Sequence, residues 1–256
     1  MIEEKALDDG LSLRVGSSLP VYQMTKVGDN VAELGLLGLD WESDIWRSAD
    51  VMRIDRFLSE SSSHRPLTEL KLCYSELGIH GLFRAQDQYV QCVQTQFQDR
   101  VARDSCVEIY FMPRPGVVPE GQAHESYINL EMSGNGTLLS YHIRDSRRQG
   151  EAFKDYDALS AEEGEKIQIE TTLPARVYPE IEEKIEWGLG FFLPFAVMEN
   201  TFGPLSLTGD SLTSQRWRVN AFKCTEDSSH PHWSSWAQCS EFNFHCPEEF
   251  GWLTFA

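Results

Sequence analysis

The sequence is poor in positive charge. Its 256 residues contain 22 lysines and arginines against 40 aspartates and glutamates, which gives a formal net charge of −18 at pH 7. Nucleic-acid binding depends on basic side chains that neutralise phosphates, so an acidic surface of this kind repels a phosphate backbone. The composition therefore argues against a nucleic-acid partner.

Long apolar runs are also missing. The densest one, residues 189–198, contains Pro194 and is much shorter than the roughly 20 residues that a membrane-spanning helix needs. The first ten residues, MIEEKALDDG, lack the basic start and the apolar block of a secretory signal. We therefore expect no membrane span. We also expect a cytoplasmic protein, or an extracytoplasmic one if a leader has been removed.

The sequence lacks the motifs of the common catalytic classes: it has no GxSxG, no phosphate-binding loop and no GxGxxG. None of its six cysteines forms a CxxC pair. Cys73 and Cys106 lie in strand-like segments, where cysteine acts as a small buried apolar residue. We predict free thiols in a reducing compartment, with disulfides as the alternative. The spacing of Cys239 and Cys246 with nearby histidines fits no common zinc module.

Alternating apolar and polar residues predict strands along almost the whole chain. TELKLCY and IHGLFRAQD, at 68–74 and 79–87, form a hairpin around the turn SELG. Further strands are expected at 104–113, 166–174, 185–194, 216–224 and 251–256, and a short helix at 194–202. Turns rather than helical crossovers join the strands, which predicts an all-β fold, an antiparallel β-sandwich with short helices in its loops. No repeat or linker interrupts the chain, so residues 1–256 are expected to form one domain.

A second hairpin is predicted around SGNG, at 133–136. We expect one apolar face made of Ile128, Leu130, Met132, Leu139, Tyr141 and Ile143. The opposite, polar face is expected to hold Asn129, Glu131, His142 and Arg144. The residues predicted to point into the sandwich are Ile109, Phe111, Ile128, Leu130, Ile143, Leu189 and Val219.

The segment SSHPHWSSW, at 228–236, places two indoles in a stretch that Pro231 prevents from being a helix interior. A sugar ring has an apolar face, which an aromatic side chain can cover, and a rim of hydroxyls, which polar side chains can bind. We predict a loop at one end or edge of the sandwich, with Trp233 and Trp236 as the platform, Trp233 at least partly exposed, and His232 beside them to reach hydroxyls. The alternative is that an indole closes the end of the core while the serines make turn hydrogen bonds.

Other polar residues are candidates for the hydroxyl rim. Arg103 offers a planar fork to two hydroxyls and Asp104 accepts from others, unless the two form a local salt bridge. Glu131 and His142 line a groove if their hairpin face is concave, and are a solvated polar face otherwise. The complete set of candidate ligand-binding residues is Tyr89, Arg103, Asp104, Glu131, His142, Lys223, His232, Trp233 and Trp236.

Five segments, in order, resemble family 9 carbohydrate-binding modules and their stand-alone relatives. They are LDWESDIWRSAD with Trp46 and Ala49, the hairpin ending in Asp87, RDSCVEIYFMP with Asp104 and Glu108, IEWGLGFFLPF, and the closing stretch with Phe-Gly-x-Leu. The resemblance covers about residues 35–256. It implies a β-sandwich that binds an oligo- or polysaccharide without catalysis. Members often bind calcium, so calcium is the cofactor it implies, with no ligands assigned.

The chain departs from this family at one wall of the site. In xylanase-linked members two tryptophans clamp the terminal sugar rings, and one of them precedes the strand that begins at Asp104. Here the segment 94–104 contains no tryptophan, and the nearest aromatic residues are Tyr89 and Phe97. We expect Tyr89, Arg103 and Lys223 to supply the second wall of a cleft with Trp233.

Two other functions compete with carbohydrate binding. A glycoside hydrolase needs two carboxylates at a fixed separation, for which Glu108 and Glu131 are the candidates. A haem-binding sandwich needs an axial methionine and histidine on adjacent strands. Met132 and His142 are expected on opposite faces of their hairpin, which argues against haem.

Overall fold

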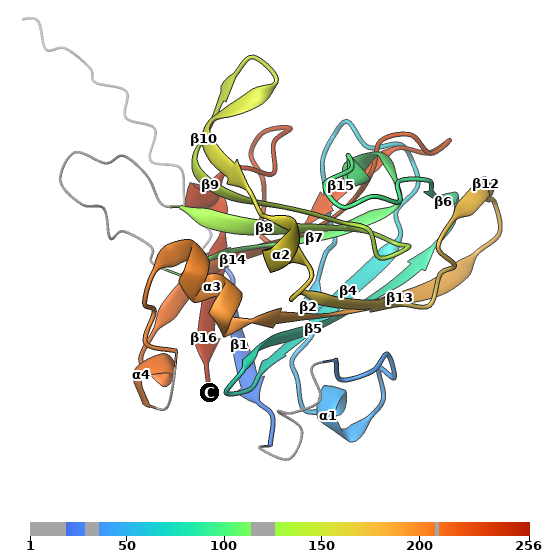
Figure 1. Cartoon of the computed structure of the whole chain (residues 1–256). Coiled ribbons are helices and arrows are strands. Elements are labelled where there is room, and N and C mark those ends of the chain that lie inside the picture. The colour runs from blue at the N-terminus through green and yellow to red at the C-terminus, as the bar shows by residue number, and fades with distance from the viewer. Residues whose placement is uncertain (1–18, 29–35, 114–125, 208–209) are drawn as a thin grey trace, which may run out of the picture.

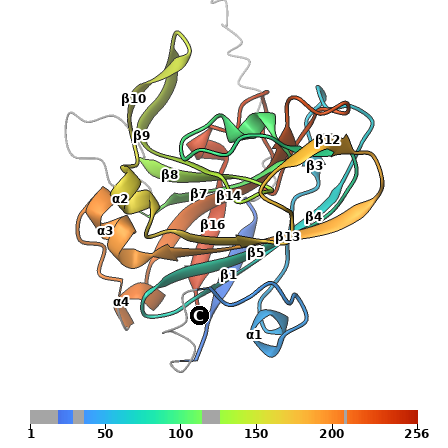
Figure 2. The same cartoon turned by 45° about the vertical axis from the view of Figure 1, so that its right-hand side comes forward.

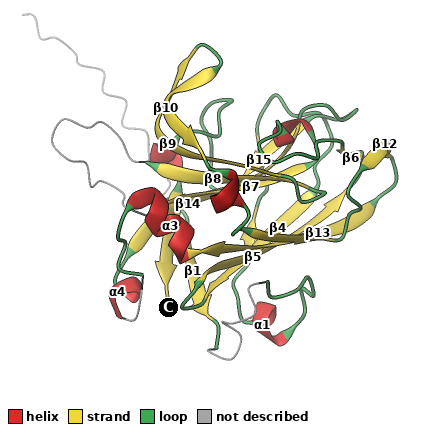
Figure 3. Cartoon of the chain, viewed as in Figure 1, coloured by secondary structure: helices red, strands yellow, loops and turns green. Residues whose placement is uncertain are grey.

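The chain folds into two stacked β layers, seen in the computed structural model in Figures 1 and 3. The structure describes residues 19–28, 36–113, 126–207 and 210–256. Layer A contains β7 (Cys106–Met112), β8 (Tyr127–Ser133), β9 (Leu138–Gln149), β10 (Ala152–Ala158), β14 (Arg216–Thr225) and β16 (Gly251–Phe255). Layer B contains β4 (Leu67–Tyr74), β5 (Gly78–Asp87), β11 (Gln168–Thr171) and β13 (Ile185–Pro194).

Shorter elements complete the fold. The remaining strands are β1 (Val21–Lys26), β2 (Met52–Arg53), β3 (Arg56–Phe57), β6 (Val90–Cys92), β12 (Val177–Ile181) and β15 (His232–Ser235). The helices are α1 (Asp44–Arg47), α2 (Ala161–Gly164), α3 (Phe195–Phe202), α4 (Asp210–Thr213) and the 3-10 turns η2 (Val101–Arg103) and η3 (Pro247–Glu249). In the part of the chain that the structure describes, no helix is long and apolar enough to span a bilayer. The segment MIEEKALDDG lies outside the described residues.

The two layers are joined through β1. Neighbouring strands follow the order β10-β9-β8-β7-β14-β16-β1-β4-β5-β13-β11, with β15 added beside β14. β1 runs parallel to both β16 and β4, whereas the other strand pairs are antiparallel. The predicted sandwich is therefore confirmed, but its sheets are mixed rather than purely antiparallel, because β1 bridges the edges of both layers. Figure 2 shows the two layers from a second direction.

The apolar core lies between the layers. Ile109, Phe111, Ile128, Leu130 and Val219 of layer A are fully buried there, as predicted. Leu189 of layer B meets them from the opposite side. Packing is tight at Gly81, where an added Cβ would lie 2.1 Å from the ring of Phe191. The predicted helix at 194–202 is α3, whose Phe195, Val197 and Met198 join the same core.

The hairpin β8–β9 has a register that differs from the prediction by one residue. Its turn contains three residues and ends at Gly136, whose φ is +91°, a conformation that favours glycine. The backbone N–H of Ser133 donates to the carbonyl of Thr137 at 2.9 Å. Asn129 consequently lies opposite Tyr141.

This register moves the side chains of β9 to the faces opposite those predicted, because successive strand residues alternate between faces. Ile143 packs in a cluster on the outer face of layer A, not in the inner core. His142 lies opposite Ile128 and faces inward, so it does not share a face with Glu131. The argument against a haem site placed Met132 and His142 on opposite faces of the hairpin. That placement was wrong, because both side chains point to the inner face.

All six cysteines are free thiols, as predicted. Five are buried and Cys246 is half-buried.

Candidate functional site

A pocket of about 400 Å³ lies on the outer face of layer A. Its floor is formed by side chains of three neighbouring strands: Glu108 and Tyr110 from β7, Glu131 from β8 and Cys224 from β14. Alternation brings these residues to one face, since Glu108 pairs with Glu131 and with Phe222 across the sheet. The pocket is at the small end of the range typical of ligand sites.

The floor is a buried hydrogen-bonded network. The Tyr110 hydroxyl donates to Glu108 Oε2 at 2.5 Å and lies 3.3 Å from Glu131 Oε1, so the two carboxyl groups share one phenol. Asn129 Nδ2 donates to Glu131 Oε1 at 2.7 Å. His245 caps the network from the loop before η3, with its Nε2 3.4 Å from the Tyr110 oxygen.

Burial perturbs the acids and the histidine of this floor. Burial raises the pKa of Glu108 well above its usual value. The pKa of Glu131 is also raised well above normal, by burial and by the nearby Glu108. The pKa of His245 falls to about 3, because burial and the charge of Arg148 disfavour the imidazolium. The floor therefore favours neutral groups, which can both donate and accept hydrogen bonds.

Aromatic side chains stand on both sides of the floor. On one side, Trp233 of β15 packs edge-to-face on Phe242, with ring centroids 4.8 Å apart. On the other side are Tyr141 of β9 and Tyr156 of β10, 5.1 Å apart. The strands β8, β7 and β14 separate β9 from β15. At about 4.8 Å per strand, the backbones of the two walls are about 19 Å apart, which leaves room between their side chains.

Arginines line the mouth of the pocket, among them Arg100, Arg103 and Arg148. The Arg103 guanidinium binds Asp227 at 2.7 Å and is about half-exposed. The salt bridge considered for Arg103 is thus present, although with Asp227 rather than Asp104. The Arg148 guanidinium carbon lies 4.1 Å from the centroid of Phe153, which holds this cation over an aromatic face.

The segment SSHPHWSSW is partly a strand. Residues 232–235 form β15, which pairs with β14 on one side and with β3 on the other. The backbone N–H of Trp233 donates to Ser61 Oγ, and its carbonyl accepts from Leu58, at 3.0 and 2.9 Å. The predicted loop is therefore an edge extension of layer A. Trp233 is half-buried on the pocket face, in line with its predicted partial exposure.

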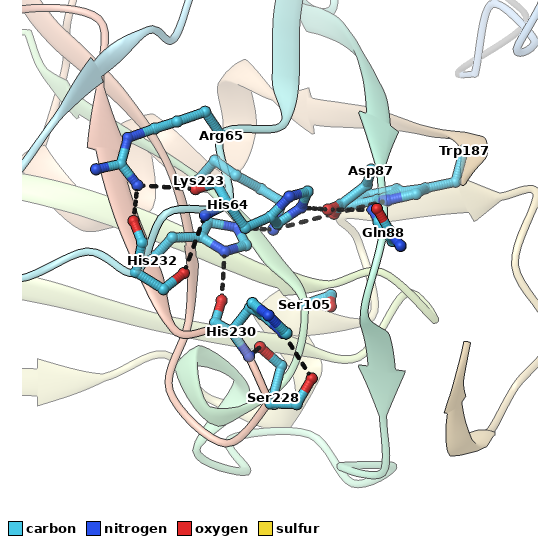
Figure 4. A network of polar contacts seen from close by, with 12 residues as sticks. His64, Arg65, Asp87, Gln88, Ser105, Trp187, Lys223, Ser228, His230 and His232 are labelled. Carbon is cyan, nitrogen blue, oxygen red and sulfur yellow. Dashed lines mark hydrogen bonds and ion pairs between the residues drawn. The ribbon is translucent and has the colours of Figure 1, made fainter. Parts of the chain in front are cut away.

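A second polar network is buried between the layers, away from this pocket (Figure 4). Lys223 of β14 points inward, and its ammonium lies 3.3 Å from Asp87 Oδ2 at the end of β5. His64 Nε2 donates to Asp87 Oδ1 at 2.8 Å, and the indole N–H of Trp187 donates to Oδ2 at 3.3 Å. Burial alone would raise the pKa of Asp87, but the charge of Lys223 and the hydrogen bonds from His64 and the backbone of Gln88 hold it well below its usual range.

His232 belongs to the same inner network. Lys223 Nζ donates to His232 Nε2 at 2.9 Å, and His232 Nδ1 donates to the carbonyl of His230 at 3.0 Å. Burial and the charge of Lys223 lower the pKa of His232 to about 3, so the ring is neutral at physiological pH. Tyr89 stacks on His230 with centroids 3.6 Å apart. Tyr89, Lys223 and His232 do not line the pocket that contains Trp233.

The other candidates are separated from the pocket as well. Asp104 is fully buried and accepts hydrogen bonds from the backbone of Val93 and Gln94 and from Ser133 Oγ, at 2.8–2.9 Å. It fixes the loop before β7. Trp236 packs against the inner core. His142 contacts Phe202 of α3 edge-to-face. The predicted second wall of Tyr89 and Lys223 is therefore wrong.

Of the nine predicted residues, the structure brings Arg103, Glu131 and Trp233 together at one pocket. The sequence reasoning missed the tyrosine wall, because Tyr141 was assigned to the core face of the hairpin. It also missed His245 and the aromatic residues of the loop 237–250. The alternation in CVEIYFM did place Glu108 and Tyr110 on the same face of their strand, so this part of the pocket floor could be predicted from the sequence.

Family and structural comparisons agree with this architecture. The sequence matches the family described as Carbohydrate-binding family 9 over residues 45–255, so the chain belongs to this family. No curated protein matches it.

Solved structures with the same fold have low sequence identity. A Bacteroides uniformis ATCC 8492 protein, provisionally assigned to carbohydrate binding, is 19% identical, with a TM-score of 0.75, over 93% of this chain and all of that one. A family 9 module from Caldicellulosiruptor kristjanssonii, solved with cellotriose, is 12% identical, with a TM-score of 0.52, over 92% and 93% of the two chains. Its complex with glucose gives 13% identity and the same TM-score, over 93% and 96%.

Proposed function

We propose that this chain binds a neutral saccharide, without catalysis, in the pocket on the outer face of layer A. Family membership supports the class of function. The observation that carries the location is the pair of aromatic walls, Trp233 on one side and Tyr141 with Tyr156 on the other, over a polar floor. Aromatic faces cover the C–H faces of a sugar ring, while fixed polar groups bind its hydroxyls.

The floor and the mouth have complementary roles in this proposal. Glu131 and Tyr110 are held in place by Asn129 and by each other, so they meet a ligand hydroxyl with little loss of side-chain entropy. Arg103 and Arg148 at the mouth provide planar donors for hydroxyls of a second ring. The volume of about 400 Å³ suits one to three rings rather than a long polysaccharide segment.

The buried state of the two carboxyl groups favours binding over hydrolysis. Glu108 accepts from Tyr110 and from the Cys224 thiol, so both of its oxygens already have partners within the floor. A catalytic acid or nucleophile must instead reach the glycosidic bond. We expect no release of nitrophenol from nitrophenyl glycosides, measured with a high concentration of the chain.

Titration with glucose and with short β-linked glucans, followed by tryptophan fluorescence and calorimetry, tests the proposal. We expect dissociation constants in the micromolar to millimolar range. A stacked ring contributes about 1–2 kcal/mol, so Trp233→Ala should weaken binding by about 5- to 30-fold or abolish it. The melting temperature should change by only a few degrees, because Trp233 is half-buried at an edge.

Trp252→Ala is the matched control. Trp252 is also half-buried, but it lies on β16 under Arg216 and Arg218 and does not line the pocket. Equal affinities for the wild type and Trp233→Ala, or equal losses in both variants, would place the binding site elsewhere.

A further inference from the structure

Three potential metal ligands converge beneath the floor of the pocket. Cys106 and Glu108 are two residues apart on β7, so both side chains point to the outer face of layer A. Cys224 lies directly across from Cys106 in the β7–β14 pair. The two sulfur atoms and a carboxylate oxygen of Glu108 all lie within 4.8 Å of one another.

Glu108 is the only carboxyl group of the three ligands, and it is buried among neutral partners. Its side chain is almost fully buried, and its partners are neutral: the Tyr110 hydroxyl at 2.5 Å and the Cys224 thiol at 3.1 Å. Within the described residues, no lysine, arginine or histidine forms an ion pair with Glu108. A buried carboxyl group of this kind stays neutral unless a cation pairs with it or it coordinates a metal, and the two thiols place soft metal ligands beside it. By contrast, the buried Asp87 has its cation in Lys223.

We infer that Cys106, Glu108 and Cys224 bind a single zinc ion at the floor of the pocket. Zinc accepts sulfur and carboxylate oxygen together, and sites with three protein ligands leave a fourth position open. Calcium requires oxygen ligands alone, and copper(I) favours sulfur alone, so the mixed donor set selects zinc. Glu108 and Cys224 line the pocket, which gives the ion a path from solvent.

Metal binding must displace protons from this site. Burial raises the pKa of the Cys106 thiol to about 12, and the pKa of Cys224 is raised by its hydrogen bond with Cys106 and by burial. Zinc binds thiolates and a carboxylate, so the thiols of Cys106 and Cys224 and the carboxyl group of Glu108 release their protons to the solvent as their bonds to zinc form. The apparent affinity should therefore increase with pH. The metal site shares Glu108 and Cys224 with the lining of the proposed sugar pocket, but its test uses no sugar, so the two proposals can fail separately.

Cobalt(II) is the probe, because its thiolate complexes absorb. The full chain, reduced and treated with a chelator that is then removed, is titrated with cobalt(II) and afterwards with zinc(II). We expect a thiolate-to-cobalt charge-transfer band that saturates at one equivalent and disappears when zinc is added. Apparent affinity should be higher at pH 8 than at pH 6.5.

Cys106→Ser and Cys224→Ser should each lower cobalt affinity by at least an order of magnitude and reduce the band. Cys73→Ser is the control, because Cys73 is equally buried but lies in layer B. Glu108→Gln keeps both thiols and should weaken binding while the band persists, which tests the site even if a serine variant fails to fold. Absence of the band in the reduced wild type, or an unchanged titration in the folded serine variants, would overturn the inference.

Discussion

The substitution Lys223→Met removes the buried ammonium group that neutralises Asp87 inside the sandwich. The ammonium lies 3.3 Å from Asp87 Oδ2, and the side chains of Lys223 and Asp87 are 0% and 1% exposed. Methionine retains most of the lysine side-chain volume, so the change isolates the charge rather than the packing. Asp87 keeps its bonds from His64, Trp187 and the backbone of Gln88.

Breaking a buried ion pair by removing one partner costs about 3–5 kcal/mol, because the remaining charge is desolvated and unpaired. For a domain of this size, 1 kcal/mol corresponds to about 2–4 °C in the melting temperature, so we expect a decrease of about 6–20 °C. Urea unfolding at pH 7 measures the loss directly, provided that the m-value does not change.

The pH dependence provides a second check on the same variant. The folded-state pKa of Asp87 lies below its unfolded value, so the pair stabilises the wild type above about pH 4, and this contribution is lost as the pH falls further. The difference between the wild type and Lys223→Met should therefore shrink in acid. Lys184→Met, at an exposed lysine, should be close to neutral.

Adding Asp87→Asn to Lys223→Met should recover much of the stability, because no buried charge remains while the amide oxygen still accepts a hydrogen bond. The affinity for sugar should not change in any folded variant, since Lys223 faces the inner core. A loss below about 1 kcal/mol for Lys223→Met, within the range of ordinary surface ion pairs, would refute the assignment of a buried, energetically important pair.

Two further predictions concern the pocket floor and the packing of layer B. The folded-state pKa of Glu131 is raised above its unfolded value, so the wild type loses stability as the pH rises above about 4.3. Glu131→Gln removes this loss. The variant should therefore increase the free energy of unfolding more at pH 8 than at pH 4.5. Urea titrations at both pH values measure this, and a pH-independent difference would contradict it. Gly81→Ala should cost about 1–3 kcal/mol or more, because the new Cβ would overlap the Phe191 ring. At Gly188 on β13 an added Cβ would lie 3.5 Å from the nearest atom, the carbonyl oxygen of Phe83, so Gly188→Ala should cost much less stability. Equal decreases in melting temperature for the two variants would refute the packing argument.

Much of the architecture could be predicted because it depends on local patterns. The hairpin β4–β5, the strands β13, β14 and β16 and the helix α3 all fall within two residues of the predicted ranges. Alternation within β7 and β14 correctly assigned Ile109, Phe111 and Val219 to the core. The parallel pairing of β1 with β16 could not be predicted in this way, because it joins residues more than 200 positions apart in the chain.

Other site residues were misplaced because their sequence context does not specify which face they occupy. Lys223 and Trp233 lie on the paired strands β14 and β15 but one position apart in register, since Trp233 lies opposite Cys224. They therefore point to opposite faces, Lys223 into the core and Trp233 into the pocket. A lysine in a strand is usually solvated, and only the presence of Asp87 on the other layer makes its burial favourable.

The sequence by itself determined the strand content, the acidic surface, the family and the position of one aromatic wall at Trp233. The tertiary structure decided the second wall and the floor. A single residue in the turn at Gly136 sets the β8–β9 register, and this turns Tyr141 outward beside Glu131 while His142 points inward. Side chains alternate with a period of two along a strand, so the register, which depends on the turn and on packing between layers, determines which of two equally well-patterned faces becomes the site.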